Sequence, residues 1–320
     1  MPLVSSSYNP PSLFKNGHFA TIYCSVFRKV YCLQKRERII LEDGDFLDLD
    51  WSYATEKTDK LVILLHGLEG SAQRPYVKGA AKIFNEHHVD ACAVNFRSCS
   101  GETNNSFGSY HSGQTQDLAA VIAHALAKQQ YQTIILKGFS LGANVILKYL
   151  SSHGNIAREV KAAIAVSAPC DLYGTMRQLH QKQNIIYHTK FKKDLLAKLR
   201  DKQQRFPELL TSEDIKAIKT LKDFDDIYTS RAHHFKDALD YYAKASSLPG
   251  LQDITVPTLI LNAKNDSFLS PSCYPFEVAE KHDSLYLETP KCGGHVGFYM
   301  HGKYSYNEIR SIDFMKNVIF

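Results

Sequence analysis

The chain has 320 residues, of which 44% are hydrophobic and 22% are charged. These proportions are close to those of an average globular protein, and they exclude a disordered, collagen-like or disulfide-scaffold chain. The formal net charge is +5, spread along the chain without a basic block or a nucleic-acid-reading motif. We therefore expect no nucleic-acid partner.

The cysteines and the apolar runs bear on the cellular compartment. Seven cysteines are scattered along the chain and form no CxxC or zinc spacing, which favours a reduced, cytoplasmic protein. The first thirty residues lack a positive segment followed by an apolar one, so we expect no secretion signal. The longest apolar runs, such as 61–65, are far shorter than the roughly 18 residues that span a bilayer.

The predicted elements begin with a hairpin. Residues 36–41 and 46–51 are runs that contain apolar residues, and they flank Glu-Asp-Gly-Asp at 42–45. Asp-Gly between two runs of this kind predicts a turn between antiparallel strands. We therefore expect the sheet to begin with an antiparallel pair.

Further along the chain, buried strands alternate with helices. Continuous apolar runs of this length indicate strands buried on both faces of a parallel sheet. They are residues 61–65, 91–95, 133–137, 162–167, 258–262 and 284–288. Amphipathic stretches predict helices near 76–87, 115–129 and 142–152, and from about 304 onward. The pattern predicts an α/β fold, with a mostly parallel central sheet flanked by helices.

The alternation breaks at residues 171–248, which are charged and helical in pattern. We interpret this segment as a helical cap or lid inserted into a single domain spanning 1–320. Thr211 to Asp214 offers a helix start of the capping-box type. Several apolar residues allow an apolar face, interpreted as the lid's own core rather than an acyl tunnel: Ile185, Ile186, Phe191, Leu195 and Leu196.

The strongest chemical signal is Gly-Phe-Ser-Leu-Gly at 138–142, between a predicted strand and a predicted helix. This is the context of a nucleophile elbow, in which flanking glycines permit a tight turn that exposes the serine hydroxyl. We predict that Ser140 is a catalytic nucleophile rather than a helix cap.

A serine nucleophile needs a base, which is itself oriented by an acid. Asp266 and His295 each follow a predicted strand, in the chain order Ser, Asp, His that this architecture uses. Asp171 is an alternative acid, although capping of the lid's first helix is its favoured role. We predict a triad of Ser140, Asp266 and His295.

The oxyanion of an acyl-transfer reaction requires preorganised N–H donors. We predict the backbone N–H groups of Leu141, which follows the nucleophile, and of Leu68, in the loop after the strand at 61–65. His66 is expected to have a structural hydrogen-bonding role. Glu69 should be turned away or paired, with Arg74 or Arg97 as candidate partners.

Other cofactor chemistry is disfavoured. The first strand is not followed by G-x-G-x-x-G or a Walker lysine motif, and no HExxH or clustered ligand set suggests a metal. We therefore predict no cofactor and no metal. The polar loops at 95–102 and 110–113 are interpreted as architecture more than substrate contact, with Asp117 at the start of the following helix.

These motifs resemble the α/β-hydrolase superfamily, and within it the YheT-type esterases, over nearly the whole chain. The resemblance rests on residues 16–21, 27–28, 66–71, 97–102, 110–113, 138–144, 266 and 293–298, with additional likeness at 223–226 and 240–242. One departure is Asn265, where many members carry an acidic residue; we expect it to be a solvated loop residue that leaves the triad undisturbed.

The motifs and the resemblance together imply a serine carboxylesterase acting through an acyl-enzyme intermediate. Its preference for short- to medium-chain acyl esters rests mainly on the resemblance. The resemblance leaves open an acyltransferase with the same triad, or a lipid or phospholipid hydrolase; a catalytically silent binding protein is disfavoured. The expected partner is a small-molecule ester, which could be lipid-like. Phe14, Lys15, Phe19, Tyr23, Phe27 and Arg28 could touch a membrane, but packing beneath the sheet is the favoured interpretation.

Overall fold

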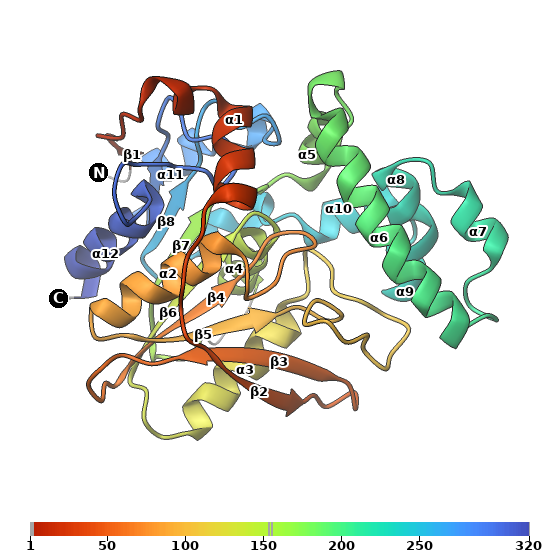
Figure 1. The fold of residues 1–320 in the computed structure, drawn as a ribbon, viewed down its shortest axis with the longest axis horizontal. Coiled ribbons are helices and arrows are strands. Elements are labelled where there is room, and N and C mark those ends of the chain that lie inside the picture. The colour runs from red at the N-terminus through yellow and green to blue at the C-terminus, as the bar shows by residue number, and fades with distance from the viewer. Residues whose placement is uncertain (1–2, 153, 155, 320) are drawn as a thin grey trace.

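The computed structural model describes residues 3–152, 154 and 156–319. Within these residues one nine-stranded sheet runs through the molecule in the order β1-β9-β8-β7-β6-β4-β5-β3-β2 (Figure 1). Its strands are β1 (Leu3–Val4), β2 (Lys35–Ile40), β3 (Phe46–Ser52), β4 (Lys60–Leu65), β5 (Asp90–Asn95), β6 (Thr133–Phe139), β7 (Val160–Val166), β8 (Thr258–Leu261) and β9 (Leu285–Glu288).

The sheet is mostly parallel, as expected. β3 runs antiparallel to both β2 and β5, and the other neighbouring pairs are parallel. The predicted hairpin is confirmed as β2 and β3, with Gly44 at φ +76° in the connecting turn. The sheet does not begin with this hairpin, however, because β1 precedes it and pairs with β9 at the opposite edge. A strand of two residues is too short to give a sequence pattern.

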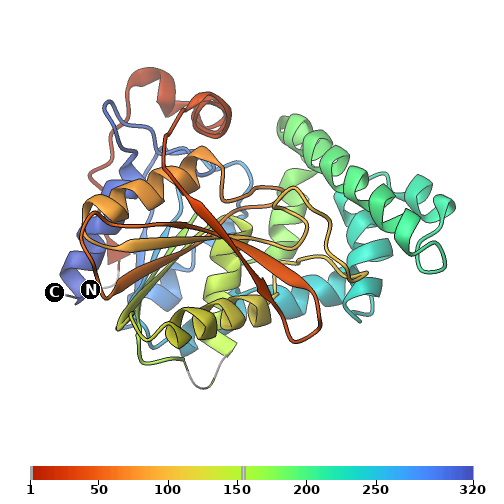
Figure 2. The same ribbon diagram turned by 60° about the horizontal axis from the view of Figure 1, so that its bottom comes forward.

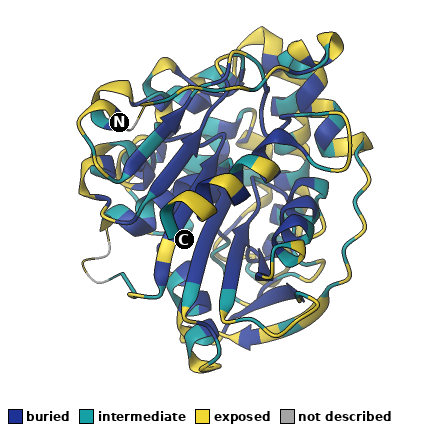
Figure 3. Cartoon of the chain, turned by 90° about the vertical axis from the view of Figure 1, so that its left-hand side faces the viewer, coloured by how far each residue is buried: buried dark blue, intermediate teal, exposed yellow. Residues whose placement is uncertain are grey.

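Helices cover both faces of the sheet. The main ones are α2 (Pro75–Glu86), α3 (Thr115–Ala127), α4 (Leu141–Ser152) and α12 (Tyr306–Ile319), with the shorter α11 (Phe276–Glu280) before β9. The central strands are consequently buried along most of their length (Figure 3). All four predicted helices of the α/β unit are therefore confirmed, to within two residues at most of their ends.

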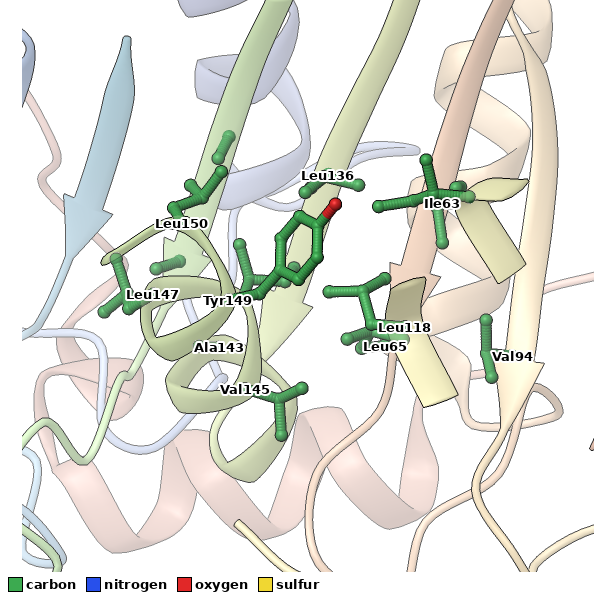
Figure 4. Close-up of a cluster of buried hydrophobic side chains, with 14 of the residues drawn as sticks. Ile63, Leu65, Val94, Leu118, Leu136, Ala143, Val145, Leu147, Tyr149 and Leu150 are labelled. Atoms are coloured by element: carbon green, nitrogen blue, oxygen red, sulfur yellow. The ribbon is translucent and has the colours of Figure 1, made fainter. Parts of the chain in front are cut away.

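Alternate residues of β4 explain why the central strands are continuously apolar. Leu61, Ile63 and Leu65 join one buried cluster with residues of α3 and α4, part of which is shown in Figure 4. Val62 and Leu64 point to the other face and join a second cluster with residues of α2 and α12. A strand buried on both faces cannot alternate between apolar and polar residues.

A helical insertion lies between β7 and β8. It comprises α5 (Leu172–Leu179), α6 (Ile185–Arg205), α7 (Ser212–Ala217), α8 (Leu221–Phe224), α9 (Ser230–Ala232) and α10 (Ala238–Ala245), with a π-helical turn at Asp225–Thr229. Figures 1 and 2 show the insertion projecting to one side of the sheet. The predicted capping box is present, because Thr211 and Asp214 each bind the other's backbone N–H.

The insertion has its own apolar cluster, which includes Leu195 and, at its margin, Phe191 and Leu196. Two residues predicted for that apolar face are not part of it. Ile185 is 57% exposed and Ile186 is 70% exposed. Helical periodicity finds an apolar face but does not say whether anything covers it.

The N-terminal segment packs on α2 and on the loop that contains Tyr299 rather than beneath the sheet. A 3₁₀ turn (Ser12–Lys15), α1 (Gly17–Ile22) and a π-helical turn (Tyr23–Phe27) lead to β2. Phe14 is buried against Tyr299, with ring centroids 3.6 Å apart, but Phe27 is 63% exposed. The expectation of packing beneath the sheet was therefore wrong for much of this segment.

Candidate active site

Ser140 lies in a tight turn between β6 and α4, where its backbone adopts φ +53°. The two flanking glycines are required because a Cβ at either position would clash with neighbouring backbone atoms. A Cβ on Gly138 would lie 2.4 Å from the carbonyl oxygen of Gly142, and one on Gly142 would lie 2.6 Å from that of His66. Only glycine fits at these two positions without moving backbone, so the turn is the strained elbow that the motif predicts.

Ser140, His295 and Asp266 form one hydrogen-bonded line. His295 Nε2 lies 2.8 Å from Ser140 Oγ, and its Nδ1 lies 2.8 Å from Asp266 Oδ2. The carboxylate accepts a hydrogen bond from Nδ1–H, which leaves Nε2 without a proton and free to accept that of the serine. Asp266 is 4% exposed and its second oxygen accepts the backbone N–H of Phe268 at 3.0 Å. The carboxylate is thus fixed behind the imidazole.

Asp171, the alternative acid, takes no part in this line. It is the N-cap of α5, where its side chain accepts the backbone N–H of Gly174 at 3.0 Å. Its other oxygen accepts the hydroxyl of Ser272 at 2.5 Å. Asp171 therefore has the capping role favoured by the sequence.

The loop after β4 passes directly beside the serine. A Cβ on Gly67 would lie 3.1 Å from Ser140 Cβ and 3.6 Å from its Oγ, so the backbone of this loop borders the nucleophile. Among the hydrogen bonds of the described residues, none uses the N–H of Leu68 or of Leu141. Leu141 is the first residue of α4, and N–H groups in a first helical turn have no acceptor within the helix. Both predicted donors therefore remain available to a ligand.

His66 supports this loop from below. It is fully buried, and its Nε2 accepts the N–H of Phe96 at 3.1 Å, so Nδ1 carries the proton and donates to the carbonyl of Gly67 at 2.7 Å. Burial lowers the pKa of His66 to about 3. The structural role predicted for His66 is therefore confirmed.

Glu69 is paired, but not with either predicted arginine. Its Oε1 accepts the hydroxyl of Tyr110 at 2.7 Å and lies 3.0 Å from Nζ of Lys198 on α6. Arg74 instead donates to the Glu69 carbonyl. Arg97 forms a bidentate pair with Asp117 and gives the loop at 95–102 the architectural role that was predicted. Lys198 is more than a hundred residues from Glu69, and no local pattern links the two.

The N-terminal helix α1 holds the loop that carries His295. Thr21 Oγ1 accepts the backbone N–H of His295 at 2.8 Å and donates to the carbonyl of Gly17 at 2.7 Å. A Cβ on Gly17 would lie 2.4 Å from the carbonyl of Asn265, so α1 contacts the loop preceding Asp266 just as closely. Sequence reasoning did not assign this role, although the motif at 16–21 was part of the family resemblance.

Asn265 joins the same contact and is not a solvated loop residue. Its Nδ2 donates to the carbonyl of Lys15 at 2.9 Å, and its Oδ1 accepts the N–H of Gly294 at 3.0 Å. An amide can donate and accept at once, whereas an ionised carboxylate only accepts. Asn265 therefore links the 3₁₀ turn before α1, the Asp266 loop and the His295 loop.

A cavity lies between Ser140 and the helical insertion. Ser140, Leu141, Leu68 and His295 line its base. The insertion contributes an apolar wall that includes Leu172, Met176, Leu179, Phe191, Leu195, Leu199, Leu221 and Phe224. Of the lid residues named from the sequence, Phe191 and Leu195 therefore serve both the insertion's own core and the cavity wall.

The cavity also has polar lining groups. Tyr110 and His111 come from the loop before α3, while Lys198, Lys202 and Asp225 come from the insertion. Burial raises the pKa of Asp225 to about 6 and lowers that of Lys202 to about 8. The loop at 110–113 thus borders the cavity, in addition to its architectural role.

The described residues contain no group of three or more His, Cys, Asp or Glu placed to hold a metal ion. Over the same residues, no helix combines the length and apolar character needed to cross a membrane.

Comparison with known proteins identifies the family. A family model described as alpha/beta hydrolase fold matches residues 60–301. The chain is also 32% identical over 299 residues to the candidate esterase YheT of Escherichia coli (strain K12), covering 92% of this chain and 87% of that protein. The chain belongs to the α/β-hydrolase family. This confirms the fold class and the YheT-like resemblance.

Two more distant similarities extend the comparison. Phospholipase ABHD3 of Homo sapiens is 24% identical over 306 residues, covering 93% of this chain and 75% of that protein. A solved esterase structure from Pyrococcus furiosus matches with a TM-score of 0.62 at 18% identity, covering 98% of each chain. The structural match supports the fold alone.

Proposed function

We propose that this α/β-hydrolase is a serine carboxylesterase with Ser140 as nucleophile, His295 as general base and acid, and Asp266 as the orienting carboxylate. The observation that carries the proposal is the position of His295, 2.8 Å from Ser140 Oγ on one side and 2.8 Å from Asp266 on the other. A hydroxyl becomes an effective nucleophile near neutral pH when such an oriented base takes its proton.

The proposed reaction has two steps. His295 takes the proton of Ser140 as Oγ attacks the ester carbonyl, and the N–H groups of Leu68 and Leu141 stabilise the oxyanion. His295 then protonates the departing alkoxide, leaving an acyl-enzyme. Water, deprotonated by the same imidazole, releases the acid and restores Ser140.

The cavity supports an ester whose acyl chain is apolar, and the family resemblance favours a chain of short to medium length. Its apolar wall comes from the insertion, and its base carries Ser140 and the proposed oxyanion donors. We propose that residues 171–248 are a lid belonging to the same domain, 1–320, and that they bind the acyl chain. A lipid-like ester fits the same chemistry, and two relatives have names that refer to an esterase and to a phospholipase.

The test measures hydrolysis of p-nitrophenyl acetate, butyrate, octanoate and palmitate by the purified protein and by Ser140→Ala. We expect the variant to lose at least a thousandfold in kcat, because members of a triad act as a unit. The chain-length optimum then gives the size of the acyl site.

A fluorophosphonate provides a second readout that does not depend on the choice of ester. We expect stoichiometric labelling of the peptide that contains Ser140, and none in Ser140→Ala. Labelling at another serine, or equal ester hydrolysis by the variant, contradicts the proposed nucleophile.

A further inference from the structure

Two segments that are distant in sequence expose large apolar side chains. The exposed fractions run from 36% for Phe19 to 70% for Ile186. The N-terminal segment contributes Leu13, Phe19, Ile22, Val26 and Phe27, and the start of the insertion contributes Tyr173, Ile185 and Ile186. We call these eight residues the apolar rim.

The exposed residues of the N-terminal segment lie on one helical face. Phe19, Ile22 and Val26 follow one another at intervals of three and four residues, so they share the outward side of α1 and the following turn. The inward side is also apolar or engaged, because Ala20 and Cys24 are buried and Thr21 holds the His295 loop. A surface helix normally keeps its outward face polar, so this outward face requires a different explanation.

The two parts of the apolar rim are neighbours. His18 of α1 and Tyr187 of α6 stack with ring centroids 5.7 Å apart, and His18 Nδ1 lies 3.2 Å from the Tyr187 hydroxyl. Figures 1 and 2 both place α1 and the start of α6 on the same side of the molecule. The two segments that carry the apolar rim therefore contact each other.

The two sequence ranges that carry the apolar rim contain basic residues and no acidic ones. Residues 1–36 contain five Lys or Arg and no Asp or Glu, and residues 172–193 likewise contain five and none. Lys15, Lys29, Lys182 and Lys193 are exposed. Bulky apolar side chains among exposed lysines are the composition that binds an anionic membrane interface.

Tyr187, which follows Ile186 of the apolar rim, connects the rim to the candidate active site. Tyr187 packs on Phe268 with ring centroids 4.7 Å apart, and Phe268 stacks on His295 at 4.2 Å. We propose that the apolar rim and its lysines dock this protein on an anionic lipid bilayer. If the proposed esterase activity holds, docking brings the cavity to esters dissolved in that bilayer.

The charge of the segments that carry the apolar rim favours an anionic bilayer over a second copy of the chain as the rim's binding partner. A twofold interface would bring the same patch from each copy together, so the lysine-rich surfaces would face one another. An anionic bilayer instead offers opposite charge and an apolar interior to the same surface.

The test is co-sedimentation with vesicles of phosphatidylcholine alone or with 30% phosphatidylglycerol, a composition chosen for the assay. The first variant replaces Leu13, Val26 and Ile186 by Ser. Its matched control replaces Ile40, Leu209 and Leu239 by Ser, three exposed apolar residues outside the rim. None of these six residues lines the cavity, so hydrolysis of p-nitrophenyl butyrate should be unchanged in both variants.

We expect the wild type and the control to bind anionic vesicles, and the rim variant to bind at least tenfold more weakly. Lys182→Glu with Lys193→Glu should weaken binding similarly, whereas Lys57→Glu should not. The proposal is overturned if the wild type leaves anionic vesicles unbound, if it binds neutral vesicles equally well, or if the control loses as much as the rim variant. It is also overturned if sedimentation equilibrium shows a dimer that the rim variant abolishes, since the rim would then be a self-association surface. Because vesicle binding is measured without substrate, it tests the docking proposal even if the esterase proposal fails.

Discussion

At the scale of single residues, the line from Ser140 to Asp266 depends on a side chain that never touches the cavity. Thr21 accepts the backbone N–H of His295 and is itself fixed by the carbonyl of Gly17. Among the residues that line the cavity, Thr21 is absent. Its contribution is therefore the position of the imidazole and not contact with substrate.

Replacing Thr21 by Val keeps the shape and removes the acceptor. We expect kcat to fall by about ten- to a hundredfold, because a displacement of the order of 1 Å in a catalytic group has an effect of that size. KM should stay within about twofold, since the cavity wall is unchanged. Steady-state kinetics with p-nitrophenyl butyrate measure both constants.

Thr21→Ser is the matched control, because it restores the hydroxyl and should recover most of kcat. A Thr21→Val protein with full kcat would show that the His295 loop is held by its other contacts. A loss in Thr21→Ser with full kcat in Thr21→Val would point to packing of the methyl group instead, because Val retains that methyl.

At the scale of elements, α6 of the insertion is joined to the loop after β4 through Lys198 and Glu69. The Glu69 side chain is 4% exposed and that of Lys198 is 29% exposed. Burial by itself would lower the pKa of Lys198, but the neighbouring Cys99 and Glu69 raise it. The lysine is thus charged and joins the insertion to the segment that carries Leu68.

Lys198→Met leaves the buried carboxylate of Glu69 without its cation. We expect a loss of about 2 kcal/mol in the free energy of unfolding, below the range for fully buried pairs because Lys198 is partly exposed. Adding Glu69→Gln should recover most of that loss, since the amide oxygen still accepts the hydroxyl of Tyr110. Urea unfolding of the two single variants and the double variant gives the coupling energy.

A strictly additive cycle would mean that solvent screens the pair and that the insertion is held by its apolar contacts alone. Esterase activity of Lys198→Met, measured in parallel, then tells whether the loop position depends on the pair.

These contacts also mark how far the sequence could predict the structure. The apolar runs around Ile63 and Ile164 predicted buried strands, because both faces of the sheet are covered. The glycines beside Ser140 predicted the elbow, because a larger residue would clash there. The pairing of Lys198 with Glu69 joins residues that only the folded chain brings together. Ile185 and Ile186 have helical spacing, but spacing does not reveal whether a face is covered. Asn265 lies in a loop without sequence periodicity, so its two hydrogen bonds could not be predicted from the sequence.

At the scale of the whole molecule, stability should depend on three histidines that the fold keeps neutral. Burial lowers the pKa of His66 to about 3, that of His111 to about 3 and that of His233 to about 4. His111 and His233 pack together with ring centroids 4.4 Å apart. In the unfolded chain a histidine has a pKa near 6.5, so unfolding below that pH takes up protons.

The lowered pKa values of the three histidines determine how the free energy of unfolding changes with pH. Between about pH 6.5 and pH 4 the unfolded state binds more protons at the three histidines, so the free energy of unfolding falls as pH falls. Asp225 acts in the opposite sense, because its folded pKa of about 6 means that the folded state holds the extra proton. At pH 5 these four groups together take up roughly two protons on unfolding, which contributes about 3 kcal/mol per pH unit to the slope.

Urea unfolding at pH 7, 6, 5.5 and 5 measures this slope directly. We expect the free energy of unfolding to fall already between pH 7 and 6, and to fall more steeply between pH 6 and 5. Asp225→Asn removes the opposing group and should steepen the slope by about one proton near pH 5, while Asp283→Asn, a change in the loop before β9, should leave it as in the wild type. A free energy of unfolding that stays level from pH 7 to 5 would mean that the histidines gain protons without unfolding the chain. Their burial would then not be the cause of acid sensitivity in this fold.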